Sequence, residues 1–399
     1  MNDLFAKLQH SREARDLAEL EKYGEQVLFP RFSPATSLPP AEVFLGKRRI
    51  VNFGSNDYLG LTREPSVIEA AVQATRRFGT GCSGSRLLNG TIELHLTLEN
   101  ELARFLNKPA ALLLTTGYQS NLAAVSALAR SRDAIIADEY CHASIVDGMR
   151  LSYARRLRFR HNSAQSLGET LENIKSNEAA LIILEGVYST GGDLGDLPGL
   201  LPVCQTHRVL LDDAHGIGVL GKHGRGTAEH YDVESEIDIV SGTFSKSLAS
   251  SGGFIASSQE VVEFVRHYSS AFVFSASMSP AALGAAREAL RIVQVEPQRR
   301  TELLKLAGFC RACLAQSGFS VPQGITPVIA VKLGDGDIRT ETIHILKFSQ
   351  RLLDAGFYVN PIFGNASATP LIRVNVSALH TQGQIVALTE AMLKIRQEP

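Results

Sequence analysis

Short apolar runs recur along the first two-thirds of the chain, and segments with helical apolar spacing separate several of them, as at 118–129 and 166–174. Strands that are apolar throughout and alternate with helices predict a mostly parallel sheet that helices cover on both faces. We therefore expect an α/β fold. The expected strands lie at 111–115, 134–137, 157–159, 180–184, 209–211, 237–240 and 254–256.

The N-terminal segment has a different pattern. Leu4, Phe5 and Leu8 begin the apolar spacing of an amphipathic helix over residues 3–23, and four prolines follow it between residues 30 and 40. We expect this arm to pack on the body of the protein or on a second subunit. A peripheral contact with a membrane stays open.

After about residue 285 the pattern changes again, to long helices and few strands. Helical spacing at 302–317 is followed by strands near 328–331 and 371–374 and by a final helix at 383–396. This mixture predicts a smaller α+β unit. The expected parts are an N-terminal helical arm (1–45), a large domain (46–285) and a small C-terminal domain (286–399).

The composition is that of a globular protein, with 44% hydrophobic and 20% charged residues among 399. Lys and Arg number 40 and Asp and Glu 41, so we expect no general attraction to nucleic acid. Five cysteines do not form a disulfide framework. Without a signal peptide or an apolar run of about 20 residues, the sequence predicts a cytoplasmic protein.

Three motifs have a structural explanation that competes with a chemical one. Residues 79–84 fit G-x-G-x-x-G, but they follow a helical segment and not a strand, which argues against dinucleotide binding. Cys310 and Cys313 lie in a helical stretch with no second pair nearby, so we interpret them as helix residues. Residues 212–215 (DDAH) could bind a metal, or a cofactor that needs a carboxylate and an imidazole. Of these two, we do not expect a metal.

The most informative stretch surrounds Lys246, which follows an apolar strand and is embedded among small hydroxyl residues and glycines. A buried lysine is costly unless it is neutral or covalently used, and a Schiff base with an aldehyde meets that condition. Thr243 and Ser245 suit a phosphate. Asp212, after another apolar run, suits a protonated pyridine nitrogen. These residues favour pyridoxal 5'-phosphate as the cofactor.

Several motifs between about residues 52 and 380 also occur in the order found in the α-oxoamine synthases, and the chain resembles this family over most of its length. These are fold-type I pyridoxal-phosphate enzymes that condense an amino acid with an acyl thioester and release CO2. The resemblance implies a large domain with a mostly parallel sheet, a smaller α+β domain and acyltransferase activity. The motifs are 55–60 (SNDYLG), 79–86 (GTGCSGSR), 116–121 (TGYQSN), 142–144 (HAS), 185–189 (EGVYS), 212–215 (DDAH), 242–246 (GTFSK) and Arg373 with 380–381 (HT).

The resemblance implies a role for each residue of the expected catalytic set. Lys246 would bind the cofactor covalently and later move the Cα proton of the amino acid. Asp212 would pair with the ring nitrogen, and His142 would stack on the ring and orient the substrate carboxylate. His215, with Ser189, would reach the ring oxygen.

The resemblance also implies how the phosphate is bound. Gly117 and Tyr118 would offer backbone N–H groups at the start of a helix, which suits an anion, and Thr243 and Ser245 would contribute as well. In this family the active site lies between two subunits. Ser277 (with Ser275) resembles the residues that reach the partner's phosphate, so we expect a homodimer with shared sites.

The expected substrate-binding residues are Arg373, Asn56 and Ser85. Arg373 would clamp the amino-acid carboxylate, for which a bidentate guanidinium is well suited. The segment 362–370 departs from the family, which has a Pro-rich loop there at the thioester entrance.

Four features resemble the bacterial serine palmitoyltransferases within the family. They imply condensation of L-serine with a long-chain acyl thioester, carried by CoA or an acyl-carrier protein, to give 3-ketosphinganine and CO2. Residues 55–58 and 212–216 are also typical of 8-amino-7-oxononanoate synthases, which use alanine and a pimeloyl thioester. The four features are 85–91, 158–162, 242–247 and 357–360.

Two further alternatives belong to other functional classes. An aminotransferase or lyase of the same fold would keep Lys246 and Asp212 but would need no acyl pocket. A catalytically inactive partner subunit is disfavoured, because Lys246 and His142 are both present.

Overall fold

The chain divides into two compact units. A computed structural model describes residues 3–11, 14–15, 18, 22, 41–334, 336–363 and 369–398. The larger unit comprises Asn56–Lys305 with Gly324–Thr326, and the smaller comprises Met1–Ser55, Leu306–Gln323 and Pro327–Pro399.

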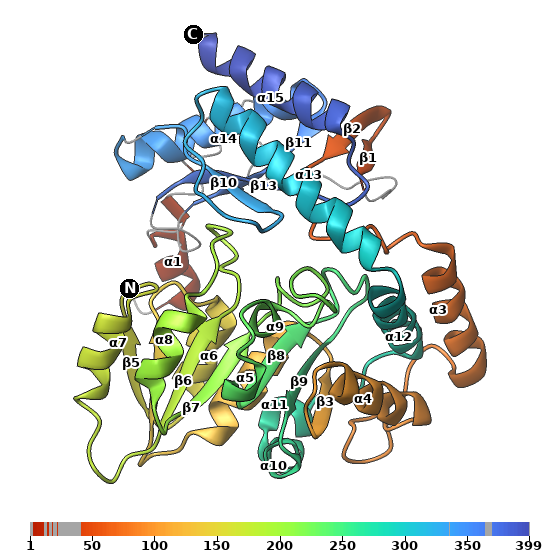
Figure 1. Cartoon of the computed structure of the whole chain (residues 1–399), viewed down its shortest axis with the longest axis vertical. Helices are drawn as coiled ribbons and strands as arrows, with labels where there is room; N and C mark the ends of the chain where they lie inside the picture. Colours follow the sequence, from red (N-terminus) through yellow and green to blue (C-terminus); the bar gives the residue numbers. More distant parts are fainter. Residues whose placement is uncertain are drawn as a thin grey trace. The chain divides into compact units, whose positions relative to one another are not determined.

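The larger unit is built on a seven-stranded sheet with the strand order β3-β9-β8-β7-β6-β4-β5 (Figure 1). All five strands from β8 to β5 run parallel, whereas β9 is antiparallel to both of its neighbours. The predicted mostly parallel sheet is therefore confirmed. The strands are β3 (Ala110–Leu114), β4 (Ala134–Asp138), β5 (Arg155–Phe159), β6 (Ala180–Glu185), β7 (Arg208–Asp212), β8 (Ile239–Thr243) and β9 (Gly253–Ser257).

Alternate residues of the central strands are buried on opposite faces of the sheet. On one face, Ile135 and Ile183 join a core with residues of α5 (Gly117–Leu128), α6 (Ala143–Leu151) and α10 (Gln259–Tyr268). Ile136 and Ile182 point the other way and are also fully buried. Burial on both faces explains why these strands are apolar throughout. Other helices of the unit are α3 (Pro65–Phe78), α4 (Glu93–Phe105), α7 (Ala164–Leu171), α8 (Leu197–Cys204), α9 (Thr227–His230), α11 (Ser270–Val273) and α12 (Pro280–Val295).

The division between the units falls inside α13 (Pro297–Gln316) and not near residue 285, where we expected it. Helix α12 stays with the larger unit because it packs closely on α3. A Cβ atom on Gly284 would lie 2.5 Å from the carbonyl oxygen of Ala70, so only a glycine permits this approach. The division into three parts drawn from the sequence stays a prediction.

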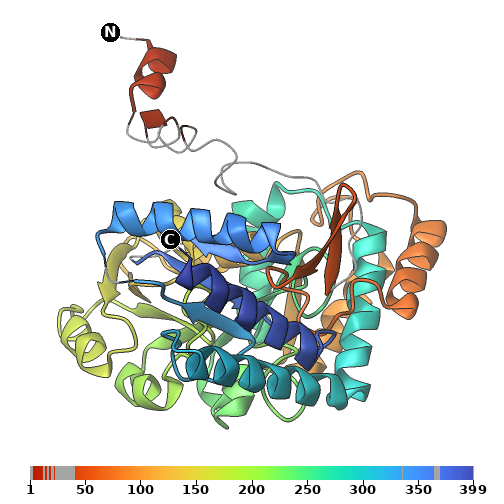
Figure 2. The same cartoon turned by 90° about the horizontal axis from the view of Figure 1, so that it is seen from above.

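The described residues of the smaller unit form two three-stranded sheets. One has the order β1-β2-β11 and the other β10-β13-β12, in which β10 and β13 form the predicted pair of strands. Figure 2 shows α14 (Ile338–Asp354) and α15 (Gln382–Gln397), which contact each other. The strands are β1 (Glu42–Leu45), β2 (Arg48–Asn52), β10 (Val328–Val331), β11 (Phe357–Tyr358), β12 (Asn360–Ile362) and β13 (Leu371–Asn375).

Residues 42–45, which we placed in the helical arm, instead form β1 and pair with β2. Gly46 makes the tight turn with a φ of 61°, and Val43 and Ile50 are paired and buried against Leu353. The expected N-terminal helix is seen at α1 (Leu4–Gln9), and its apolar side chains are exposed. Most of residues 12–40, including most of the rest of the expected helix, lies outside the described residues, as does 364–368 in the segment that departs from the family.

Among the residues that the structure describes, none of the helices combines the length and the apolar character needed to cross a bilayer.

Candidate active site

Polar residues gather where the parallel strands end. Glu185, Asp212 and Thr243 are the last residues of β6, β7 and β8, and Glu185 is paired in register with Asp212. This edge of a parallel sheet is where α/β proteins bind ligands. A cavity of about 320 Å³ opens there. Nine of the predicted site residues line it: Lys246, Asp212, His142, His215, Gly117, Tyr118, Thr243, Ser245 and Ser189.

Asp212 is buried and held in one orientation. Its Oδ2 accepts a hydrogen bond of 2.6 Å from the Nδ2 of Asn121, and its Oδ1 accepts one of 3.1 Å from the backbone of Ala214. Asn121 is fixed in turn, because Ser241 donates to its Oδ1 at 2.7 Å and its Nδ2 also reaches Ser144 at 2.8 Å. A carboxylate held in this way can support a positive charge in the cavity without having to reorient.

His142 is the N-cap residue of α6. Its Nδ1 accepts from the backbone N–H of Ser144 at 3.2 Å and lies 2.7 Å from the hydroxyl of the same residue. The backbone N–H of His142 donates to the buried carboxyl group of Glu185. Desolvation lowers the pKa of His142, Asp212 opposes that shift and Lys246 adds to it. Since its Nδ1 accepts a hydrogen bond from the backbone of Ser144, the Nε2 is the nitrogen that can act on a substrate.

His215 is buried and belongs to a hydrogen-bonded chain with two residues of the SNDYLG motif. Its Nδ1 lies 2.7 Å from the hydroxyl of Tyr58, which lies 3.3 Å from the Oδ1 of Asn56. Tyr58 has one proton, so when it donates to Asn56, the Nδ1 of His215 must be the donor to Tyr58. Asn56 thus acts on the site through Tyr58 and does not itself line the cavity.

Another part of the cavity lining suits an anion. Thr116 caps α5 by accepting from the backbone of Gln119, and the N–H groups of the first turn, at Gly117 and Tyr118, have no intrahelical acceptor. A Cβ atom on Gly117 would lie only 2.7 Å from the Cβ atom of Thr243. Any larger residue at position 117 would therefore displace Thr243 from the cavity lining. The hydroxyl groups of Thr243 and Ser245 lie 2.8 Å apart beside it.

The DDAH motif does not converge on one point. Asp213 points away from Asp212 and accepts from the backbone and hydroxyl of Thr227, at 2.6 and 2.7 Å. Burial raises the pKa of Asp213 to about 6. Across the described part of the chain, no cluster of three or more His, Cys, Asp or Glu side chains is placed to hold a metal.

Besides Asn56, three predicted residues do not line the cavity. Ser85 forms an isolated bridge with Ala276, and the hydroxyl of Ser277 donates to the carbonyl of Gly84 at 2.9 Å, so these two segments are joined to each other. Neither Ser85 nor Ser277 lines the cavity. Arg373 is the middle residue of β13 in the smaller unit.

Comparison with known proteins identifies the family. The family model described as aminotransferase class I and II matches residues 48–392. The serine palmitoyltransferase of Sphingobacterium spiritivorum is 38% identical over 94% of each chain. The 8-amino-7-oxononanoate synthase of Geobacter sulfurreducens is 37% identical over 95% of this chain and 97% of its own. A solved serine palmitoyltransferase from S. paucimobilis, with PLP and myriocin bound, has a TM-score of 0.92 and 32% identity over 99% of this chain and 98% of its own.

The chain belongs to the class I and II aminotransferase family, in its α-oxoamine synthase branch. Its fold is the fold type I that the sequence predicted.

Four residues at the site of this α-oxoamine synthase were not predicted from the sequence. They are Asn121, Ser144, Glu185 and Tyr58, which hold Asp212, His142 and His215 in place. All four occur in the quoted family motifs. The spacing of Asn121, four residues after Gly117 in one helix, was the available signal, because residues four apart share a helix face.

Proposed function

We propose that this α-oxoamine synthase uses pyridoxal 5'-phosphate to condense L-serine with a long-chain acyl thioester. The thiol and CO2 leave, and 3-ketosphinganine is formed. The observation that carries the proposal is the convergence of Lys246, the Asn121-bound carboxylate of Asp212 and His142 on one cavity. The two relatives named above support the acyltransferase class, since both are synthases or transferases of this branch.

The donor set of the cavity fits the cofactor. Lys246 supplies the amine for the aldehyde, Asp212 the carboxylate for the ring nitrogen, and the start of α5 with Thr243 and Ser245 the donors for the phosphate. The cofactor, when bound, supplies an electron sink that stabilises a carbanion at Cα of the amino acid.

The residues of this chain would prepare and protect that carbanion. Asp212 would hold a proton on the ring nitrogen, because its charge is fixed by Asn121 and Ala214. Lys246 would take the Cα proton and return it. His142 would orient the substrate from Nε2, since Ser144 engages its Nδ1.

The choice of amino acid is the finer part of the proposal. Serine differs from alanine by a hydroxyl group, and a site that bonds this hydroxyl discriminates by more than a site that merely admits it. Arg373 stays the proposed clamp for the carboxylate. The alternative is 8-amino-7-oxononanoate synthesis, since the two named relatives are 38% and 37% identical to this chain.

A substrate panel tests this choice. We expect steady-state turnover with L-serine to exceed turnover with alanine or glycine by about 10-fold or more, and to rise from short to long acyl thioesters. Release of the thiol and of CO2 would be measured together. A preference for alanine with a pimeloyl thioester would replace the proposal with the biotin-pathway activity, and transamination without thiol release would place the chain among the aminotransferases.

We also propose that the protein is a homodimer with shared active sites. The joined segments around Ser85 and Ser277 expose two large apolar side chains, Leu88 at 81% and Phe274 at 85%. Single exposed apolar side chains are common on protein surfaces, but two on segments that are joined to each other favour a protein contact. A second copy of the chain would cover it and bring Ser277 to the partner's phosphate.

Light scattering tests this assembly. The wild type should have twice the mass of one chain, and Leu88→Glu with Phe274→Glu should produce monomers with at least about 10-fold lower turnover, because charges would be buried in the contact. Ile338→Glu is the control, since Ile338 is also exposed, at 62%, and lies on α14. A monomeric wild type with full activity would refute the shared site.

A further inference from the structure

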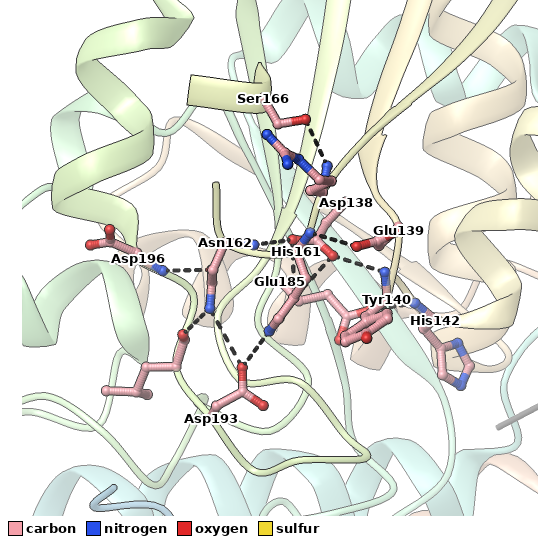
Figure 3. A network of polar contacts seen from close by, with 12 residues as sticks. Asp138, Glu139, Tyr140, His142, His161, Asn162, Ser166, Glu185, Asp193 and Asp196 are labelled. Atoms are coloured by element: carbon pink, nitrogen blue, oxygen red, sulfur yellow. Dashed lines mark hydrogen bonds and ion pairs between the residues drawn. The ribbon is translucent and has the colours of Figure 1, made fainter. Parts of the chain in front are cut away.

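A polar network lies beside the cavity and is not explained by the proposed chemistry (Figure 3). Its centre is His161. This residue lies in the segment 158–162, which resembles the serine palmitoyltransferases but has been given no role so far. The network joins Asp138 at the end of β4 to Asp193 in the loop after β6, and it includes Asn162 from the loop after β5. The loops after β4 and β6 carry His142 and Ser189 to the cavity.

Both ring nitrogens of His161 bond to carboxylates. The Nδ1 lies 3.1 Å from Asp138 and the Nε2 lies 2.8 Å from Asp193. A carboxylate only accepts, so both nitrogens must carry a proton for both bonds to exist. The ring is held further by stacking on Tyr140, with centroids 4.6 Å apart, and by the edge of Tyr188 at 4.4 Å.

Asp138 organises the loop that leads to His142. It ends β4, its side chain has no exposure, and it accepts from the backbone of Tyr140 at 2.8 Å and of Asn162 at 2.9 Å. Its own carbonyl accepts from the backbone of Cys141 at 3.1 Å. Because His142 comes next and caps α6, the position of Asp138 sets the position of that imidazole.

Asp193 organises the loop on the other side. Its carbonyl accepts from the backbone of Tyr188 at 2.9 Å, next to Ser189 in the sequence, and Val187 is bridged to Leu194. Asn162 joins the same loop by donating to the carbonyl of Leu194 at 2.9 Å. The loop therefore contacts His161 through the side chain of Asp193 and the neighbouring Asn162 through its backbone.

We propose that His161 is a positioning residue that, as an imidazolium, ties the loop of His142 to the loop of Ser189 and so aligns both on the substrate. The expected effect on catalysis rests on the proposed function. The link between the two loops is independent of that function.

The link depends on pH in a definite direction. Burial lowers the pKa of His161, but the bonds to Asp138 and Asp193 outweigh it and raise the pKa to about 9. The other titratable groups at the ring are Tyr140 and Tyr188, with Glu139 accepting from the His161 backbone at 3.0 Å. Since the pKa is raised, the link is complete at neutral pH and is lost as the pH rises through about 9.

The first experiment compares pH profiles of the holoenzyme. Asp193→Asn keeps an acceptor for Nε2 but removes a charge, so the alkaline fall of kcat should begin about one pH unit lower than in the wild type. Glutamine has its donors on a single nitrogen, so His161→Gln cannot reproduce the two separate ring nitrogens that bond to Asp138 and Asp193. Its kcat should fall by about 10- to 100-fold, with the KM for the amino acid changed less than kcat. His267→Gln, which alters a histidine on α10 beside Glu263, is the control.

A second measurement does not need turnover. Amide hydrogen exchange of the holoenzyme at neutral pH should increase in peptides covering 139–146 and 187–194 in His161→Gln, and not in His267→Gln. An alkaline limb at the same pH in wild type and Asp193→Asn, or unchanged exchange in both peptides, overturns the inference. Failure of the wild type to turn over any amino acid with any thioester overturns the proposed function instead, and the exchange result then decides the inference alone.

Discussion

Lys246→Ala should lose the covalent, borohydride-reducible bond to pyridoxal phosphate and at least about 10³-fold in turnover. Lys246 is the one lysine that lines the cavity among the described residues, so no other amine there can replace it. The alanine would remove both the link to the cofactor and the base for the Cα proton. Borohydride reduction followed by peptide mass mapping measures the first loss, and thiol release measures the second.

Lys222→Ala is the matched control for this change. Lys222 is an exposed residue of the same unit and does not line the cavity. This variant should keep the reducible bond and near wild-type turnover. A reducible bond that persists in Lys246→Ala on another lysine would show that Lys246 does not hold the cofactor.

Asp212→Asn should slow turnover by about 10²- to 10³-fold while the cofactor still binds. The amide is nearly the same size as the carboxylate but has no charge to hold a proton on the ring nitrogen. Turnover at saturating substrate and the cofactor content after dialysis would be measured together. Near wild-type turnover would remove Asp212 from this role.

A companion variant separates the charge of Asp212 from its orientation. Asn121→Ala keeps the carboxylate but removes its hydrogen bond of 2.6 Å, so the loss should be smaller, about 10-fold. An Asn121→Ala variant as slow as Asp212→Asn would mean that orientation, and not charge, dominates.

The fold was predictable where burial alone decides the pattern. The apolar runs of β4, β6 and β7 are buried on both faces of the sheet. Burial on both faces requires apolar residues at every position, and this pattern is visible in the sequence. The antiparallel direction of β9 was not predictable, because an apolar strand reads the same in either direction. The hairpin of β1 and β2 was missed because Val43 and Ile50 become a pair only once Leu353, distant in the sequence, covers them.

By itself, the sequence determined which residues carry reactive groups and at which strand ends they stand. Lys246, Asp212 and His215 could be named because an amine, a carboxylate and an imidazole after apolar strands meet at one edge of a parallel sheet. His142 was implied by the resemblance to the α-oxoamine synthases. Only the tertiary structure decided how these groups are held. Asn121 orients Asp212 from 91 residues away, and Tyr58 meets His215 across 157. A hydrogen bond depends on distances of a few tenths of an ångström between distant segments, and no pattern of spacing along the chain encodes them.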